Sequence, residues 1–89
     1  MEIVVTGSSG FIGKSVCHRL KQLGNNVIKL DFAKGDDITD IKSFDKIENC
    51  DLIIHLAAKS YVPDAFRNPH SFYYTNVLGT LNALETARR

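Results

Sequence analysis

Glycines at a regular spacing are the residues of this 89-residue chain whose pattern points most directly to chemistry. Gly7, Gly10 and Gly13 follow the β-branched run Ile3–Val5 and open a segment with helical periodicity. The first N–H groups of a helix have no partners within it and its dipole attracts negative charge, so such a junction can bind phosphate. We expect Gly7 to make the tight turn, Gly10 to admit phosphates and Gly13 to let the helix approach the strand. An ordinary glycine-containing turn is the alternative.

Asp31 is the second candidate, 18 residues after Gly13 and directly after the apolar run Val27–Leu30. A carboxylate at the end of the second strand of a nucleotide-binding unit accepts hydrogen bonds from the ribose hydroxyls of adenosine and repels a 2′-phosphate. No arginine stands close after Asp31, and Lys34 is the only base close to it in the sequence. The pattern therefore predicts NAD as the cofactor in preference to NADP. A solvated aspartate at a strand end is the alternative.

The other reactive side chains form no catalytic or metal-binding pattern. Cys17, His18, Cys50 and His55 lack the spacing of zinc ligands, and no serine or cysteine nucleophile is placed to use His55. We therefore expect no metal site, and we expect His55 to be a structural residue on an apolar strand.

Three apolar runs alternate with three amphipathic segments, and these elements must position the candidate residues. The runs predict strands at Ile3–Val5, Val27–Leu30 and Leu52–Leu56, and the amphipathic segments predict helices over residues 10–23, 40–47 and 68–89. This order indicates an α/β, three-layer fold, β-α-β-α-β-α, with a parallel sheet and right-handed crossovers. We expect a partial Rossmann (doubly wound) fold with strand order 3-2-1, which leaves the first strand as an unpaired edge. Apolar spacing marks one face of the first and last helices: Ile12, Val16, Leu20 and Leu23, and Tyr73, Val77, Leu81 and Leu84.

Composition and charge narrow the class of protein. The 89 residues are 44% hydrophobic and 24% charged, which suits one small domain. A net charge of +1 argues against a nucleic-acid or membrane-surface partner, and no apolar run is long enough to span a bilayer. Two cysteines and the lack of a signal-peptide pattern favour a reducing compartment, so we expect the cytoplasm.

The motifs together resemble a known family. Thr6 followed by the G-x-x-G-x-x-G spacing resembles the short-chain dehydrogenase/reductase superfamily. Three further segments, Gly35–Asp40, His55–Ala58 and Asn76–Thr80, resemble motifs of its extended branch, the NAD-dependent epimerase/dehydratase family. The resemblance covers essentially the whole chain, and its motifs occur in the family's order.

The resemblance also implies roles for residues outside the glycine loop. Asp37 and Ile38 would flank the adenine, although the stretch from Asp31 to Asp37 is shorter than is usual in the family and a capping loop is the alternative. Leu56, Ala57 and Ala58 would line the dinucleotide, Lys59 or Ser60 would reach the ribose beside the nicotinamide, and Asn76 would hold the backbone around the cofactor. The predicted cofactor-binding residues are Gly7, Ser9, Gly10, Phe11, Ile12, Gly13, Asp31, Asp37, Ile38, Leu56, Ala57, Ala58, Lys59 and Asn76.

An activity follows from the resemblance, although its catalytic residues are missing here. The family implies an NAD-dependent epimerase, dehydratase or reductase that acts on a nucleotide-linked sugar. Its chemistry depends on a Tyr-x-x-x-Lys pair, and none of Tyr61, Tyr73 and Tyr74 has a lysine four residues later. We therefore expect residues 1–89 to be the N-terminal part of an NAD-binding Rossmann domain, with the catalytic half and the substrate domain absent and no activity alone.

Two alternatives stay open at this point. The chain could be a non-catalytic nucleotide-binding or interaction mini-domain, or part of an NADP-dependent reductase of a non-sugar substrate. Leu78 and its neighbours lie either in a homodimer interface, as the resemblance implies, or in a helix that covers the sheet of a monomer.

Overall fold

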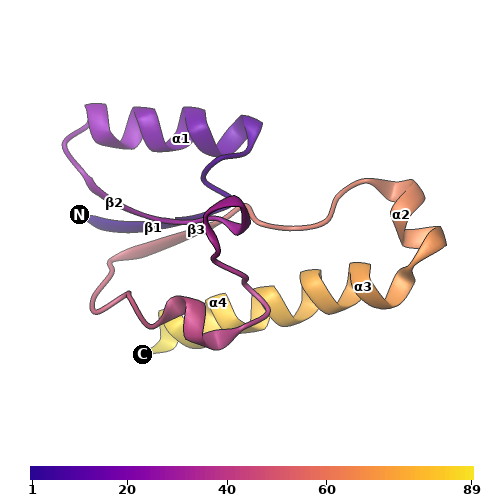
Figure 1. Ribbon diagram of the computed structural model, residues 1–89. Coiled ribbons are helices and arrows are strands. Elements are labelled where there is room, and N and C mark those ends of the chain that lie inside the picture. The colour runs from indigo at the N-terminus through magenta and orange to yellow at the C-terminus, as the bar shows by residue number, and fades with distance from the viewer.

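In the computed structural model, which describes residues 1–89, three strands lie between α1 on one side and α4 on the other (Figure 1). This arrangement confirms the predicted three-layer α/β architecture. The elements in chain order are β1 (Glu2–Thr6), α1 (Phe11–Gln22), β2 (Asn26–Leu30), the 3₁₀ turns η1 (Phe32–Lys34) and η2 (Ile41–Phe44), β3 (Leu52–His55), α2 (Val62–Arg67), α3 (Pro69–Tyr73), the π-helical turn η3 (Tyr74–Leu78) and α4 (Gly79–Arg88).

The sheet is parallel with the order β2-β1-β3, so the predicted order 3-2-1 is wrong and β1 is the central strand instead of an edge. Right-handed crossovers explain the difference. The crossover from β1 to β2 places α1 on one face, and the crossover back across β1 to β3 places the later segments on the opposite face. With the order 3-2-1 both connections would lie on the same face, and the other face of β1 would be uncovered. In the observed order Ile3, Val4 and Val5 are at most 2% exposed.

Alternating residues of β1 serve two separate hydrophobic cores. Ile3 and Val5 point toward α1 and pack with Cys17. Val4 points to the opposite face, where it packs with Phe44 of η2 and with the residues Leu30, Ile38, Ile47 and Ala83. Burial on both faces is the reason that β1 reads as a continuous apolar run without alternation.

Helix α1 buries its small residues most deeply, and only half of its predicted apolar face packs on the sheet. Gly13 and Cys17 are its buried residues, and Val16 and Leu20 pack against the same core, whereas Ile12 and Leu23 are 62% and 61% exposed. A small side chain lets the helix backbone approach the sheet closely, which a large apolar residue at the same place would prevent.

Helix α4 packs on the sheet in the same way. Its buried residues are Gly79, Asn82, Ala83 and Thr86. The apolar face predicted for the C-terminal helix runs through α3, η3 and α4 and is exposed at all four positions, Tyr73, Val77, Leu81 and Leu84. A Cβ atom on Gly79 would lie 2.7 Å from Cγ1 of Ile38, so this helical glycine is required by close packing.

Local signals in the sequence gave several helix ends correctly. The predicted caps Asp40 and Asn68 accept hydrogen bonds from the N–H groups of Lys42 and Ser71, at 3.0 and 3.1 Å. The helix predicted over residues 40–47 is shorter, a single 3₁₀ turn at Ile41–Phe44. Residues 57–68, which read as a loop, contain the short helix α2.

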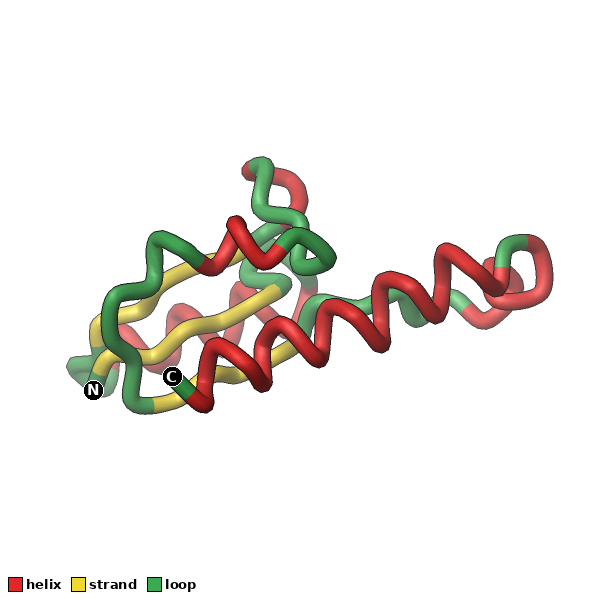
Figure 2. The backbone as a smooth tube through the Cα atoms, turned by 90° about the horizontal axis from the view of Figure 1, so that it is seen from below, coloured by secondary structure: helices red, strands yellow, loops and turns green.

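Helices α3, η3 and α4 form one continuous rod that extends beyond the sheet, with α2 near its far end (Figure 2). We call the projecting part, residues 59–74, the arm. None of the helices is long and apolar enough to cross a membrane.

Candidate functional site

The glycine loop joins β1 to α1 in the geometry that its spacing predicts. Gly7 has φ +68°, a conformation that residues with a Cβ rarely adopt, and its N–H donates to the carbonyl of Leu30 at 2.9 Å. Gly10 is the residue before α1, and a Cβ there would meet only the Gly7 carbonyl oxygen, at 3.3 Å. A Cβ on Gly13 would lie 2.9 Å from Cα of Ser8, which confirms the close approach expected between helix and loop.

The N-terminus of α1 is open to an anion. No side chain caps it, and its first turn carries no acidic residue. The first N–H hydrogen bond within this helix is donated by Lys14 to the Gly10 carbonyl, at 3.0 Å, so the N–H groups of Phe11, Ile12 and Gly13 precede the ladder. Ser9 is half-buried in the loop, and Phe11 is 95% exposed. These residues therefore surround a cluster of free donors at the positive end of a helix dipole.

Thr6, which the sequence offered only as part of a motif, connects the ends of β1 and β3. Its side-chain oxygen accepts hydrogen bonds from the N–H groups of Leu56 and Ala57, at 3.0 and 3.1 Å, and lies 2.7 Å from Nδ1 of His55. These hydrogen bonds hold the segment after β3 against the glycine loop. The approach is close, because a Cβ atom on Gly7 would lie 2.9 Å from the Ala57 nitrogen. A buried hydroxyl at a strand end is common, so the sequence carried no signal for this role.

His55 has a structural place in this network, as expected. With two N–H groups donating to it, the Thr6 hydroxyl donates its own proton to Nδ1, and Nε2–H donates to the Thr80 hydroxyl at 3.2 Å. The Thr80 hydroxyl in turn donates to the carbonyl of Asn76 at 2.6 Å. Burial lowers the pKa of His55 below its usual value of 6.5 because desolvation disfavours the charged ring. The chain of bonds accounts for a neutral histidine with defined proton positions.

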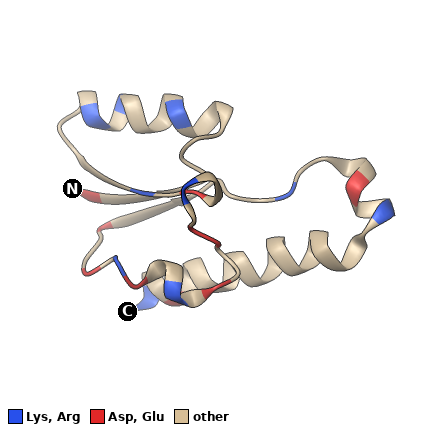
Figure 3. Cartoon of the chain, viewed as in Figure 1, with Lys and Arg blue, Asp and Glu red and all other residues tan.

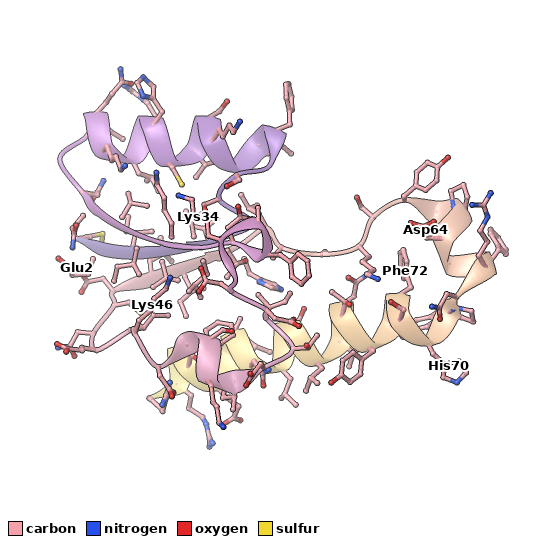
Figure 4. The ribbon with its side chains drawn as sticks, viewed as in Figure 1. Glu2, Lys34, Lys46, Asp64, His70 and Phe72 are labelled. Carbon is pink, nitrogen blue, oxygen red and sulfur yellow. The ribbon has the colours of Figure 1, made fainter.

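Asp31 lies at the end of β2, next to the glycine loop, and one of its carboxylate oxygens is unsatisfied. The residue is 9% exposed, and its Oδ2 is buried without a hydrogen-bond partner. Asp36 accepts from the Asp31 N–H at 3.1 Å and forms an ion pair with Lys46 at 3.1 Å, so the charge of Lys46 is paired with Asp36. Figure 4 labels the Lys46 side chain. A buried carboxylate oxygen without a partner is expected where a ligand donates to it. Asp31 therefore fits a pair of ribose hydroxyls.

The two residues predicted to flank an adenine ring make contacts within the protein itself. Asp37 accepts from the N–H and the hydroxyl of Thr39 through Oδ1, at 2.9 and 2.7 Å, which is the capping loop of the alternative interpretation. Ile38 is 5% exposed and packs against Gly79, and its carbonyl accepts from Asn82 at 2.8 Å. Contacts of either side chain with an adenine stay predictions.

The segment after β3 is placed by Asn76. The Asn76 amide accepts from the N–H of Lys59 at 2.7 Å and donates to the Lys59 carbonyl at 2.8 Å, so the specific hydrogen bond expected of this helical asparagine is present. The Lys59 ammonium donates to the Ser71 hydroxyl on α3, so this side chain is held within the arm. Leu56 and Ala58 are exposed beside it, and Ala57 is half-buried. A contact of Lys59 or Ser60 with a cofactor stays a prediction.

Part of the predicted set lies together at the carboxyl ends of the strands. The glycine loop, Asp31 and Ala57 are close there, while Ile38 packs against α4 and Lys59 begins the arm. In open parallel sheets, ligands bind in the crevice at this end of the strands. Fold and site together define a partial Rossmann-type nucleotide-binding unit.

Comparison with known proteins places the chain in a family. It belongs to the NAD dependent epimerase/dehydratase family, whose model matches residues 3–89. One similar curated protein is dTDP-glucose 4,6-dehydratase of Mycobacterium tuberculosis, which is 32% identical over an alignment of 111 positions that covers 100% of this chain and 33% of the relative. The chain therefore spans about a third of the length of the curated relatives that it matches.

Solved structures support the same placement. The chain is similar to Thermus thermophilus UDP-glucose 4-epimerase in complex with NAD, with 29% identity and a TM-score of 0.87, over 99% of this chain and 34% of that one. It is also similar to the RMD protein of Pseudomonas aeruginosa complexed with NADPH, with 33% identity and a TM-score of 0.79, over 99% of this chain and 31% of that one. Structures of this fold have thus been solved with both NAD and NADPH.

Proposed function

We propose that residues 1–89 bind the adenosine half of NAD within an enzyme that acts on a nucleotide-linked sugar. The observation that carries this proposal is the buried, unpartnered carboxylate oxygen of Asp31 beside the open N-terminus of α1. Family membership, and relatives named as epimerases and dehydratases of nucleotide sugars, support the substrate class.

Each part of the site has a distinct task in this proposal. The free N–H groups at the start of α1 hold the pyrophosphate, and the lack of a side chain on Gly10 lets it come within hydrogen-bond distance. Asp31 accepts from the ribose hydroxyls. The small side chains of Ala57 and Ala58 let the dinucleotide lie close to the backbone, and Thr6 holds this segment in place through its hydrogen bond with the Ala57 N–H.

Residues 1–89 bind and orient, and the reaction itself needs further groups. NAD supplies hydride acceptance at a sugar carbon when it is bound. Proton transfer at the sugar oxygen requires a group such as the tyrosine of a Tyr-x-x-x-Lys pair, which these 89 residues do not contain. We therefore expect no turnover by this region alone and weak, measurable binding of the dinucleotide.

Isothermal titration of the chain with NAD⁺ tests the proposal, with Asp31→Asn as the variant. A hydrogen bond to a charged group contributes about 1.5–3 kcal/mol, so the variant should bind about tenfold to a hundredfold more weakly. Asp45→Asn is the matched control, because Asp45 is exposed at the end of η2 and away from the loop. Equal affinity for NAD⁺ in the Asp31 and Asp45 variants would reject the role of Asp31.

A further inference from the structure

Two sets of hydrogen bonds hold the segment that follows β3, residues 56–59, which we call the exit segment. At its start, the Thr6 side-chain oxygen accepts from the N–H groups of Leu56 and Ala57, at 3.0 and 3.1 Å. At its end, the Asn76 side chain accepts from the Lys59 N–H at 2.7 Å and donates to the Lys59 carbonyl at 2.8 Å. The exit segment is therefore fixed at both ends by side chains of other elements.

The His55 ring connects these two sets of bonds. Its Nδ1 lies 2.7 Å from the Thr6 oxygen, and its Nε2 lies 3.2 Å from the Thr80 hydroxyl. The Thr80 hydroxyl donates in turn to the carbonyl of Asn76 at 2.6 Å, one turn earlier in the same rod. A continuous chain of hydrogen bonds thus runs from β1 through the ring to η3, alongside the exit segment.

This chain of bonds accepts a neutral ring and excludes a protonated one. The N–H groups of Leu56 and Ala57 occupy both lone pairs of the Thr6 hydroxyl, whose own proton goes to Nδ1 of a neutral ring. A proton on Nδ1 would make three donors for two lone pairs and leave the hydroxyl proton without an acceptor. Because Thr6 is 0% exposed, water cannot take over either role. Protonation of the ring would therefore break a bond to the exit segment.

No charged group compensates for a proton at this place. Residues 68–84, which include Thr80, contain no lysine, arginine, aspartate or glutamate, and Figure 3 shows this part of the rod in tan. The charged groups on the elements packed against β3, next to it in the chain and at the same end of the sheet are Glu2, Asp31, Asp51, Lys59, Glu85 and Arg88. None of them shifts the pKa of His55, which is lowered below 6.5 by burial alone. The fold thus favours the neutral ring.

We propose that neutral His55 is a positioning residue for the bound dinucleotide, because it keeps the exit segment in place against the glycine loop. The inference rests on the proposed function, which places Ala57 and Ala58 along the dinucleotide. The exit segment is close to the loop, since a Cβ atom on Gly7 would lie 2.9 Å from the Ala57 nitrogen. A proton on the ring acts through Thr6 to release the segment, so protonation of this one histidine weakens the binding of NAD⁺.

An NMR titration of the ¹⁵N-labelled chain without nucleotide tests the first half of the proposal. The ring signals of His55 give the midpoint of its titration, and amide exchange is then compared between the wild type and His55→Asn at one pH unit below that midpoint. The asparagine oxygen takes the place of Nδ1 as the acceptor for Thr6 and does not titrate. We expect the Ala57 amide to exchange about tenfold faster in the wild type, as a locally opened segment does. The Val4 amide, at the centre of the sheet, should exchange equally in both, which excludes global unfolding as the cause.

Calorimetric titration with NAD⁺ at pH 7.5 and at that lower pH tests the second half. One pH unit below the midpoint about a tenth of the rings are neutral, so the wild type should lose about tenfold in affinity beyond any loss in His55→Asn. His18→Asn is the matched control and should keep the wild-type loss, because His18 is exposed on α1. At pH 7.5, His55→Asn should bind more tightly than His55→Phe, which fills the space and offers Thr6 no acceptor. A merely structural histidine would give neither the pH profile nor this rescue.

The failures of the two proposals are distinguishable. If the ring titrates while the exchange of the Ala57 amide matches that of His55→Asn, the positioning role is overturned. An equal pH dependence of the NAD⁺ affinity in the wild type and in His55→Asn overturns it as well. If exchange at Ala57 follows the ring but no variant binds NAD⁺ at either pH, the proposed function is rejected, while the hold of His55 on the exit segment is confirmed.

Discussion

Two sets of polar side chains at neighbouring strand ends, Thr6 with His55 and Asp31 by itself, differ in how many of their hydrogen-bond partners the protein supplies. At the ends of β1 and β3, the Thr6 hydroxyl and both ring nitrogens of His55 have partners within the chain. At the end of β2, Asp31 is just as deeply placed, and one of its oxygens has none. The first group holds the backbone after β3 in place, and we propose that the second is left for a ligand. Burial alone therefore does not separate structural from binding residues, whereas the count of satisfied hydrogen bonds does.

The largest effect on stability is expected from substitution of Thr6, whose hydroxyl is fully hydrogen-bonded within the chain. Thr6→Val keeps the shape of the side chain and leaves the Ala57 N–H and the Nδ1 of His55 without their partner, whereas the Leu56 N–H still donates to the Thr6 carbonyl, at 3.3 Å. Each unsatisfied group costs about 1–3 kcal/mol, and partial access of water reduces the sum, so we expect unfolding free energy to fall by about 2–4 kcal/mol. Urea denaturation measures this. Thr6→Ser keeps the hydroxyl and should recover most of the loss. A Thr6→Val protein as stable as the Thr6→Ser protein would contradict the structural role.

A smaller effect on stability, of the opposite sign, is expected from substitution of Asp31, whose Oδ2 has no hydrogen-bond partner. Asp31→Asn neutralises a buried carboxylate whose Oδ2 has no partner in the free protein, so its free energy of unfolding should stay equal or rise by up to about 1 kcal/mol. The same variant loses affinity for NAD⁺. A loss of stability of the size found for Thr6→Val would remove the distinction between the two groups.

The smallest effect is a pH dependence of the network around His55. The folded protein holds this ring with a lowered pKa, so between that pKa and 6.5 the unfolded chain binds more protons. Stability from this group is therefore complete above pH 6.5 and decreases as the pH falls below it. Denaturation at pH 7.5 and pH 5.5 checks the direction. His55→Gln should lose this part of the pH dependence, and His70→Gln, on the exposed arm (Figure 4), should keep it.

Residues with local roles were predictable from the sequence. The glycine spacing gave the turn at Gly7 and the close approach at Gly13, and the caps Asp40 and Asn68 were correct, because each depends on a few neighbouring residues. The end of β2 placed Asp31 correctly beside the glycine loop, since a strand end and a βα turn are adjacent in any unit of this type.

Features that depend on long-range packing were not predictable in the same way. The strand order follows from covering both faces of β1, which the run Ile3–Val5 does not reveal by itself. The buried positions of the helices include small residues such as Cys17 and Gly79, which periodicity of large apolar residues does not indicate. That periodicity selected an exposed face for the C-terminal helix, and for α1 it found two residues that pack on the sheet, Val16 and Leu20. The role of Thr6 depends on residues that the crossovers bring together, so no local pattern in the sequence indicates it.

The most direct test of the contrast between the two strand ends is a map of backbone amide chemical shifts as NAD⁺ is added to the ¹⁵N-labelled chain. We predict that the shifted N–H signals belong to Gly7–Gly13, Asp31 and Ala57–Ala58, and that the C-terminal turn of α4 near Arg88 is unaffected. Shifts confined to the arm or to α4, or no shift at millimolar NAD⁺, would contradict the assignment of this strand end as the nucleotide site.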